Sequence, residues 1–274
     1  MFGIDAIGPT MQSASLIQDY DMPVNAMIVG ASAGIGLALS HQLATRDQVA
    51  RLFVVARTAT RNPALAELVA QSHGRIVAVD CDIRDEIALA RMTAAVAGSI
   101  SALHLVINTA GMLHENTTAG NLRPEKSLAQ VTLAGLQASF AINAFGPILL
   151  AKALLPLLRH KSSAVFASLS ARVGSIGDNR AGGWYSYRAA KAAQNQLLKT
   201  LAIELTRLNP QAIVLALHPG TTDTGLSKPF QANVSTEKLF SATYSAEALL
   251  QVISARVPAD SGNFYAWDGQ PIDW

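Results

Sequence analysis

Short apolar segments recur along the chain and alternate with longer segments of helical pattern. Six of them cover residues 25–30, 51–57, 75–80, 103–108, 163–170 and 212–220, and 261–267 could add a last strand. Runs of consecutive apolar residues are typical of strands buried on both faces of a sheet. Helical patterns begin between them near Gly34, Pro63, Asp85, Pro124 and Trp184. The alternation predicts an α/β fold, with a doubly wound parallel sheet, right-handed crossovers and helices on both faces.

The length and composition are those of one globular domain. Half of the 274 residues are apolar and 15% are charged, which excludes a disordered chain. We expect residues 1–24 to form an N-terminal arm or tail and residues 25–274 to form the domain. No internal repeat or change in composition indicates a second domain.

Charge and cysteine content exclude several kinds of partner. The net charge is +2 without a basic run, so nucleic acid and anionic membranes are not expected partners. The single cysteine, Cys81, and six histidines without ligand spacing indicate a reducing compartment and no structural metal. The apolar segment 140–160 is interrupted by Asn143, Gly146, Pro147 and Lys152, which favours a buried helix over a membrane span. No secretory signal is visible, and we expect a soluble, cytoplasmic protein.

A glycine-rich loop directly follows the first predicted strand. The segment GASAGIG contains Gly30, Gly34 and Gly36 and precedes a predicted helix. Glycines there permit a tight turn and a close approach of the backbone to a pyrophosphate, which the free N–H groups of the helix would bind. A simple tight turn is the alternative. The position at the first strand–helix junction favours a dinucleotide and a Rossmann-like fold.

The end of the second predicted strand indicates which dinucleotide is preferred. An acidic residue there would accept hydrogen bonds from the ribose 2′-hydroxyl of NAD. The sequence has Ala56 and Arg57 instead, and a guanidinium suits the 2′-phosphate of NADP. We expect NADP(H) in preference to NAD(H), unless Arg57 points to solvent and the pocket accepts both. Asp82 and Ile83 follow the third strand where an adenine would lie, although Asp82 could instead cap a helix.

Tyr187 and Lys191 lie four residues apart and would share one face of a helix. A tyrosine hydroxyl has a pKa of about 10, and a nearby ammonium favours the phenolate. The pair could therefore act as an acid/base device. The alternative is an exposed pair that stabilises its helix by a few tenths of a kcal/mol.

Several motifs together resemble the short-chain dehydrogenases/reductases. After the glycine loop, NTAG follows the fourth strand at 108–111, and Asn143 lies in the next helix. SLSARVG closes the fifth strand, Tyr187 and Lys191 match the Tyr-x-x-x-Lys motif, and HPGTTDT covers 218–224. The motifs occur in family order over about residues 25–270. The stretch 171–191 is also similar to a bacterial branch related to the developmental C-signal protein.

The resemblance implies a role for each member of the site. Tyr187 is the implied general acid in reduction and base in oxidation, and Lys191 lowers its pKa and holds the nicotinamide ribose. Three serines, Ser168, Ser170 and Ser175, lie close together in the sequence. Ser170 is the implied hydrogen-bond donor to the substrate oxygen, with Ser168 as the runner-up. Asn143 would hold a helix distortion and a water that completes a proton relay. The implied cofactor-binding residues are Gly30, Ser32, Gly34, Ile35, Gly36, Arg57, Asp82, Ile83, Asn108, Ala110, Gly111, Lys191, Pro219, Gly220 and Thr222, and no metal is expected.

These roles predict an NADP(H)-dependent oxidoreductase that interconverts a small-molecule carbonyl and an alcohol by hydride transfer. Two other classes stay open, an NADP-binding sensor or signalling protein and a cofactor-recycling epimerase. The segment 225–250 is expected to form a partly apolar lid, or else a surface loop followed by a core helix. The family implies a homodimer or homotetramer through helices 124–159 and 184–208, whose apolar faces could equally pack on the sheet.

Overall fold

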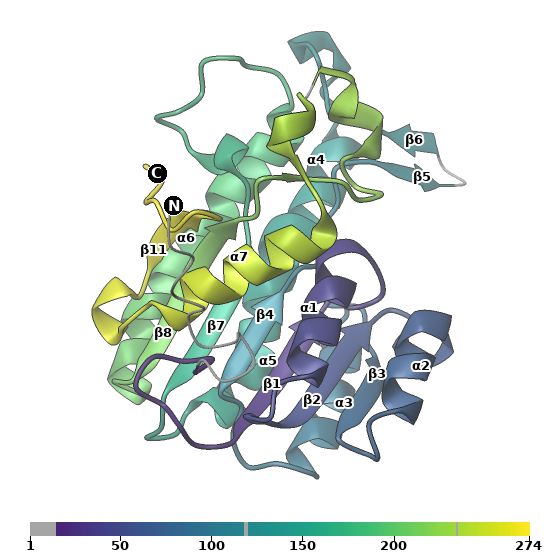
Figure 1. Cartoon of the computed structure of the whole chain (residues 1–274). Coiled ribbons are helices and arrows are strands. Elements are labelled where there is room, and N and C mark those ends of the chain that lie inside the picture. Colours follow the sequence, from purple (N-terminus) through teal and green to yellow (C-terminus); the bar gives the residue numbers. More distant parts are fainter. Residues whose placement is uncertain (1–14, 118–119, 234) are drawn as a thin grey trace, which may run out of the picture.

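A seven-stranded parallel sheet forms the centre of the computed structural model, which describes residues 15–117, 120–233 and 235–274 (Figure 1). The spatial order of the strands is β11-β8-β7-β4-β1-β2-β3. They are β1 (Val24–Val29), β2 (Val49–Ala56), β3 (Ile76–Asp80), β4 (Leu105–Asn108), β7 (Ala164–Leu169), β8 (Ala212–His218) and β11 (Asn263–Ala266). All seven predicted strands are therefore present, the candidate last strand included.

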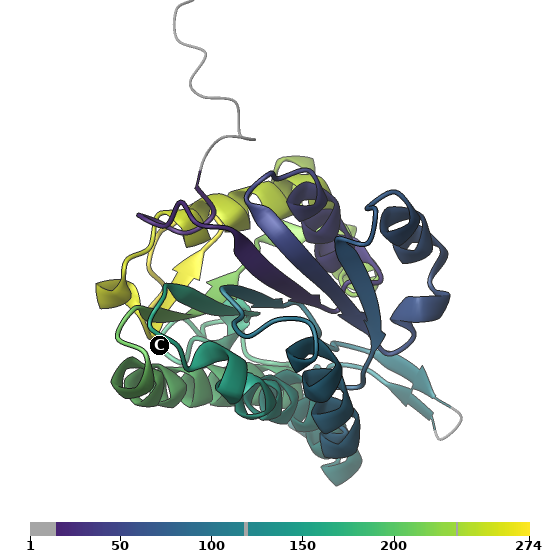
Figure 2. The same cartoon turned by 90° about the horizontal axis from the view of Figure 1, so that it is seen from below.

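Helices cover both faces of the sheet, as the view from below shows (Figure 2). One layer consists of α1 (Gly34–Ala44), α2 (Pro63–Ala70) and α7 (Ala242–Ser254). The other consists of α3 (Glu86–Ala97), α5 (Gly146–Leu158) and α6 (Tyr185–Leu208). Each layer encloses its own apolar cluster, with Leu39 and Leu249 in the first and Leu89 and Leu154 in the second. The predicted Rossmann-like, doubly wound sheet is confirmed.

Side-chain caps explain where several helices begin. Asn62 precedes α2 and accepts a hydrogen bond from the N–H of Leu65, and Asp85 caps α3 in the same way through two N–H groups. The predicted helix start near Pro124 is wrong. Helix α4 (Leu133–Phe140) begins later, after the cap Thr132, because an irregular segment and a 3₁₀ turn (Leu128–Gln130) come first.

Among the described residues, the helical stretch from Leu133 to Leu158 is the one that is long and apolar enough to be a candidate membrane span. It joins α4 to α5 through a π-helical turn, Ala141–Phe145, that contains Asn143. By length and composition it could cross a membrane, since its most apolar window has a mean hydropathy of 1.7. Half of that window is buried, and α5 packs on the sheet. The expected buried helix is what the fold contains.

The remaining elements lie around the carboxyl edge of the sheet. The hairpin β5 (Glu115–Thr117) and β6 (Gly120–Leu122) projects beside α4 (Figure 1). The pair β9 (Thr221–Thr222) and β10 (Leu239–Phe240) brackets two 3₁₀ helices, Lys228–Asn233 and Thr236–Lys238. Helix α7 follows and packs in the core against α1. The described part of the segment 225–250 thus consists of 3₁₀ turns, the short strand β10 and the core helix α7.

The described part of the predicted N-terminal tail is packed against the domain. Leu16 and Ile17 are buried in the first apolar cluster, and the N–H of Leu16 donates to Oε1 of Gln48 at 2.8 Å. Val24, which we expected in the tail, is the first residue of β1. The packed region therefore begins earlier than residue 25, and residues 1–14 lie outside the described residues.

Candidate active site

A pocket of about 820 Å³ opens at the carboxyl edge of the sheet. It lies where the strand order reverses, because β1 has β2 on one side and β4 on the other. Open α/β sheets bind ligands at this switch point. Its walls come from segments that follow β1, β2, β3, β4, β7 and β8, so residues far apart in sequence meet there.

The glycine-rich loop forms the floor of this pocket. Gly30 has φ of +83° and Gly34 has φ of +52°, a region that favours glycine. A Cβ at Gly30 would stand 2.6 Å from Oγ1 of Thr109, and a Cβ at Gly36 would collide with the carbonyl oxygen of Gly30. No side chain caps α1, so the N–H groups of its first turn face a loop that carries almost no side chains. This cradle fits the pyrophosphate of a dinucleotide.

Tyr187 and Lys191 lie on the first turns of α6 and both line the pocket. Nζ of Lys191 is 5.8 Å from the centroid of the Tyr187 ring, so the two side chains share one face. The ammonium donates at 2.8 Å to the carbonyl oxygen of Leu169 and at 2.8 Å to Oε1 of Gln194. The pair is therefore a buried wall of the pocket and not an exposed pair on a helix surface.

Burial dominates the protonation of both groups. It raises the pKa of the Tyr187 phenol above its ordinary value and lowers the pKa of Lys191 to about 7. The expected lowering of the Tyr187 pKa by Lys191 is therefore not found in this structure. The physical reason is that the lysine is desolvated as well, so near neutral pH its own positive charge is only partly present.

The structure separates the three candidate serines. Ser170 lines the pocket, and its hydroxyl donates to Oδ1 of Asn195 at 2.6 Å. Ser168 is fully buried behind the wall, where it accepts hydrogen bonds from Asn108 and Gln194. Ser175 is also buried and accepts from the N–H of Asp178. Of the three, only Ser170 can meet a ligand in this pocket.

Two predicted site residues lie behind the pocket wall. Asn108 bonds to Ser168 and to the N–H of Ala110, so it holds the turn after β4. Asn143 is fully buried in the π-helical turn, as the expected helix distortion requires. Its side chain accepts from the N–H of Met112 and donates to the Met112 carbonyl oxygen. The other predicted cofactor-binding residues line the pocket: Gly30, Ser32, Gly34, Ile35, Gly36, Arg57, Asp82, Ile83, Ala110, Gly111, Lys191, Pro219, Gly220 and Thr222.

The family comparison agrees with this geometry. The sequence profile described as short chain dehydrogenase matches residues 24–235, which include the glycine loop, Tyr187 and Lys191. The chain belongs to the short-chain dehydrogenase family. It is 33% identical over 149 residues to the C-signal protein of Myxococcus xanthus, a match that covers 54% of this chain and 84% of that protein.

Other members of the family match over most of the chain. A 1-hydroxy-2-glutathionyl-2-methyl-3-butene dehydrogenase of Rhodococcus is 29% identical over 248 residues, covering 90% of this chain and 98% of that one. The NADPH-bound carbonyl reductase from chicken fatty liver superposes with a TM-score of 0.78 at 26% identity, covering 92% of this chain and all of that one. This chain is therefore an oxidoreductase of the short-chain dehydrogenase family.

Charged groups of this dehydrogenase gather at the end of the pocket beyond the glycine loop. Arg57 and Arg84 both line it, and Arg84 forms an ion pair with Asp82 at 2.6 Å. Hydrogen bonds from Arg84 are the main cause of the lowered Asp82 pKa, to which the charge of Arg57 also contributes. Asp82 does not cap α3, because Asp85 does. Arg84, which sequence reasoning missed, adds a second cation to this end.

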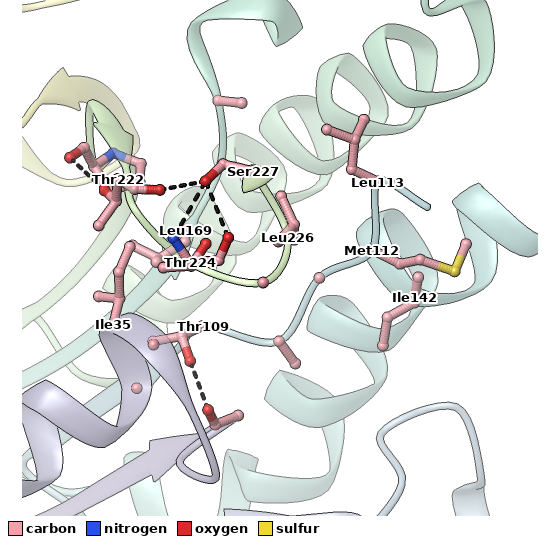
Figure 3. Close-up of a pocket in the computed structure, with 18 of the residues that line it drawn as sticks. Ile35, Thr109, Met112, Leu113, Ile142, Leu169, Thr222, Thr224, Leu226 and Ser227 are labelled. Carbon is pink, nitrogen blue, oxygen red and sulfur yellow. Dashed lines mark hydrogen bonds between the residues drawn. The ribbon is translucent and has the colours of Figure 1, made fainter. Parts of the chain in front are cut away.

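The opposite end of the pocket is apolar and carries aromatic rings. Figure 3 shows Met112, Leu113, Ile142 and Leu226 around it. Close by, the ring of Trp184 lies 5.4 Å from that of Phe230, centroid to centroid. The predicted apolar lid region thus contributes Leu226 and Phe230 to the pocket wall. This end suits the carbon skeleton of a substrate.

Three further residues at the site escaped sequence reasoning. On the next turn of α6, Asn195 accepts a hydrogen bond from Ser170 and Gln194 accepts one from Lys191. In the sequence these two amides cannot be told apart from the other polar residues of the helix. His218 lines the pocket, and its Nδ1 has no hydrogen-bond partner within the described residues. Burial lowers the pKa of His218 to about 4, so its ring is neutral at pH 7.

Proposed function

We propose that this dehydrogenase is an NADP(H)-dependent oxidoreductase that interconverts a carbonyl and an alcohol, with Tyr187 as general acid and base. The observation that carries the proposal is that Tyr187, Lys191 and Ser170 line one pocket together with the glycine loop. The glycine loop would bind the dinucleotide, and the three polar side chains would bind a carbonyl oxygen beside it. The similar chicken enzyme is a carbonyl reductase, which is the same reaction class.

A bound nicotinamide dinucleotide supplies the hydride, and the chain supplies position and a proton. Burial keeps the Tyr187 phenol protonated, which is the form that can donate to a carbonyl oxygen as negative charge develops there. In the proposed reaction the hydroxyl of Ser170 hydrogen-bonds the same oxygen. Lys191, with a pKa of about 7, can supply a proton near neutral pH that replaces the one Tyr187 donates.

The preference for NADP(H) is part of the proposal. Arg57 and Arg84 place two guanidinium groups at the end of the pocket where β2 and β3 finish. Guanidinium groups donate paired hydrogen bonds to phosphate oxygens. No acidic residue follows β2 to accept from a ribose 2′-hydroxyl. The chicken carbonyl reductase, which was solved with NADPH bound, is a precedent for this nucleotide on the same fold.

We propose further that the subunit forms a homodimer or homotetramer through the helices α4, α5 and α6. Leu133 on α4, Phe145 in the π-helical turn before α5 and Ile203 on α6 are large apolar side chains that are 70%, 50% and 54% exposed. Apolar groups left on a helix surface favour association with a second copy. A cytoplasmic location and the absence of a metal or nucleic-acid partner stay expectations from composition.

Loss of NADPH absorbance against a panel of aldehydes and ketones tests the proposed reaction. We expect turnover of some carbonyls, with one NADPH consumed for each alcohol formed. An epimerase would convert its substrate without net consumption, and a sensor would bind NADPH without turnover. Tight NADPH binding with no consumption across the panel, together with epimer formation from a hydroxylated substrate, would contradict the proposal.

A further inference from the structure

A buried carboxylate touches the helix that carries Tyr187 and Lys191. Glu125 lies in the segment between β6 and α4 and is only 5% exposed. Its carboxylate accepts hydrogen bonds from the N–H of Ser186, at 3.1 Å, and from the Ser186 hydroxyl. Its backbone carbonyl oxygen accepts from the N–H of Trp184 at 2.5 Å. Three hydrogen bonds thus join one residue to the first turn of α6.

Glu125 replaces a cap that α6 lacks. The residue before α6, Trp184, has a left-handed backbone and makes no side-chain cap. A cap side chain ordinarily accepts from the second or third N–H of a helix, and Ser186 supplies the second. A carboxylate is also the favourable charge at this end of a helix dipole. No ion pair of the described residues involves Glu125, so the helix end and the serine supply the hydrogen bonds to its carboxyl group.

The same serine is tied from its other side to the π-helical turn. The hydroxyl of Ser139 donates to the carbonyl oxygen of Ser186 at 3.2 Å. Nδ2 of Asn143 donates to the Ser139 hydroxyl at 3.2 Å. Ser186 therefore sits between Glu125 on one side and the buried asparagine on the other. Because Ser186 directly precedes Tyr187, these bonds fix the turn of backbone from which the phenol projects.

The surroundings of Glu125 leave room for this arrangement. Gly135 faces the carboxylate, and a Cβ there would stand 3.6 Å from Oε1 of Glu125. Tyr187 lines a small cavity together with Glu125 and Ser186. The buried carboxylate, the serine and the tyrosine are therefore neighbours in one packed unit behind the pocket.

We propose that Glu125 is a positioning residue that holds Tyr187 for proton transfer by capping α6 from a distance. This inference rests on the proposed carbonyl reduction. Glu125 does not line the large pocket, so it acts through Ser186 and the helix backbone. A misplacement of a reacting group by about 1 Å costs on the order of 100-fold in rate. Loss of the cap should therefore lower kcat and leave cofactor affinity nearly unchanged.

The test compares Glu125→Ala with Glu125→Gln in the full-length protein. We expect Glu125→Ala to lower kcat about 10- to 100-fold, with the Kd for NADPH within about twofold of the wild-type value. Glu125→Gln should recover most of the loss, because its amide oxygen accepts from the Ser186 N–H and its amide N–H can donate to the hydroxyl. Glu204→Ala, an exposed glutamate on α6, is the matched control. A wild-type kcat in Glu125→Ala would overturn the proposal.

Two further measurements keep the outcome decisive. If Glu125→Ala does not fold, Ser186→Ala removes only the hydroxyl bond and should lower kcat by about threefold to tenfold, whereas an unchanged kcat would overturn the proposal. If the wild type reduces no carbonyl, the proposed function fails. Amide hydrogen exchange of residues 184–191 then tests whether Glu125 holds the first turns of α6. We expect at least about tenfold faster exchange in Glu125→Ala than in Glu125→Gln. Equal rates would overturn the positioning role.

Discussion

The hydroxyl of Ser170 donates a hydrogen bond of 2.6 Å to Oδ1 of Asn195. Both residues are buried, and Nδ2 of Asn195 has no hydrogen-bond partner within the described residues. If the Asn195 side-chain amide flipped, so that its oxygen and nitrogen exchanged places, Nδ2 would donate to the serine oxygen. The serine proton would then be free to bond a carbonyl oxygen. The direction of the serine proton therefore depends on Asn195.

The first prediction concerns this amide. In Asn195→Asp the carboxylate can only accept, so it keeps the serine proton away from the substrate. We expect kcat for carbonyl reduction to fall about 10- to 100-fold, with the Kd for NADPH unchanged within about twofold. Gln196→Glu places the same change on the exposed side of α6 and should keep the wild-type kcat. Steady-state kinetics of the two variants check this, and equal kcat values would show that Asn195 does not direct the serine proton.

The second prediction concerns the choice of cofactor. Replacement of Arg57 by alanine removes one of two guanidinium groups at the end of the pocket. We expect the Kd for NADPH to rise about 10- to 100-fold and the Kd for NADH to change by less than about twofold. Arg61→Ala is the control, since Arg61 is exposed and does not line the pocket. Equal weakening of both nucleotides, measured by fluorescence titration, would show that Arg57 does not read the 2′-phosphate.

The third prediction follows from the buried lysine. Burial lowers the pKa of Lys191 from 10.5 to about 7, so between these values the unfolded chain binds more protons than the folded chain. The free energy of unfolding therefore gains a contribution that rises with pH from 7 towards 10.5. Lys191→Met should lack that rise, which amounts to about 1–3 kcal/mol between pH 7 and pH 9.

Urea unfolding at pH 7 and pH 9 measures this difference directly. Lys161→Met, in an exposed turn, should retain the wild-type pH dependence. The comparison stays below pH 10, where unfolded tyrosines lose their protons and the raised pKa of Tyr187 would begin to lower stability. The same pH dependence in wild type and Lys191→Met would show that the lysine is not held neutral.

The fourth prediction concerns a histidine at the opposite edge of the sheet. Burial, and secondarily the charge of His160, lower the pKa of His104 from 6.5 to about 4. The unfolded chain binds more protons between these values, so stability is lost as the pH falls from 6.5 to 4. His104→Gln should reduce that acid loss by about 1–3 kcal/mol. Unfolding at pH 7.5 and pH 5, with exposed His41→Gln as control, checks the sign.

Much of this architecture could be predicted from the sequence because its signals are local. A buried parallel strand needs a run of apolar residues, so the run in 164–169 identifies β7 directly. The turn at Gly30 needs a residue that tolerates positive φ, and a helix places Tyr187 and Lys191 on one face whatever the tertiary context. The strands and the centre of the site follow from such constraints.

The remaining parts depend on contacts that form only in the folded chain. Glu125 meets Ser186 across 61 residues of sequence, and Ser170 meets Asn195 across 25, and no local pattern encodes either pairing. The sequence shows that Lys191 is close to Tyr187, but it does not show the burial of the phenol, which raises the Tyr187 pKa. It misplaces the start of α4 for a related reason, since Pro124 is compatible with a helix start and equally with the irregular segment it occupies.

Two tyrosines, two residues apart on α6, provide the decisive comparison. Tyr187 is buried in the pocket wall, whereas Tyr185 is 42% exposed on the same turn. Tyr187→Phe should lower kcat for carbonyl reduction at least about 100-fold while NADPH still binds within about threefold of the wild-type Kd, because only the proton donor is lost. Tyr185→Phe should keep the wild-type kcat. Turnover by Tyr187→Phe at a rate near that of Tyr185→Phe would contradict the assignment of Tyr187 as the acid and with it the proposed mechanism.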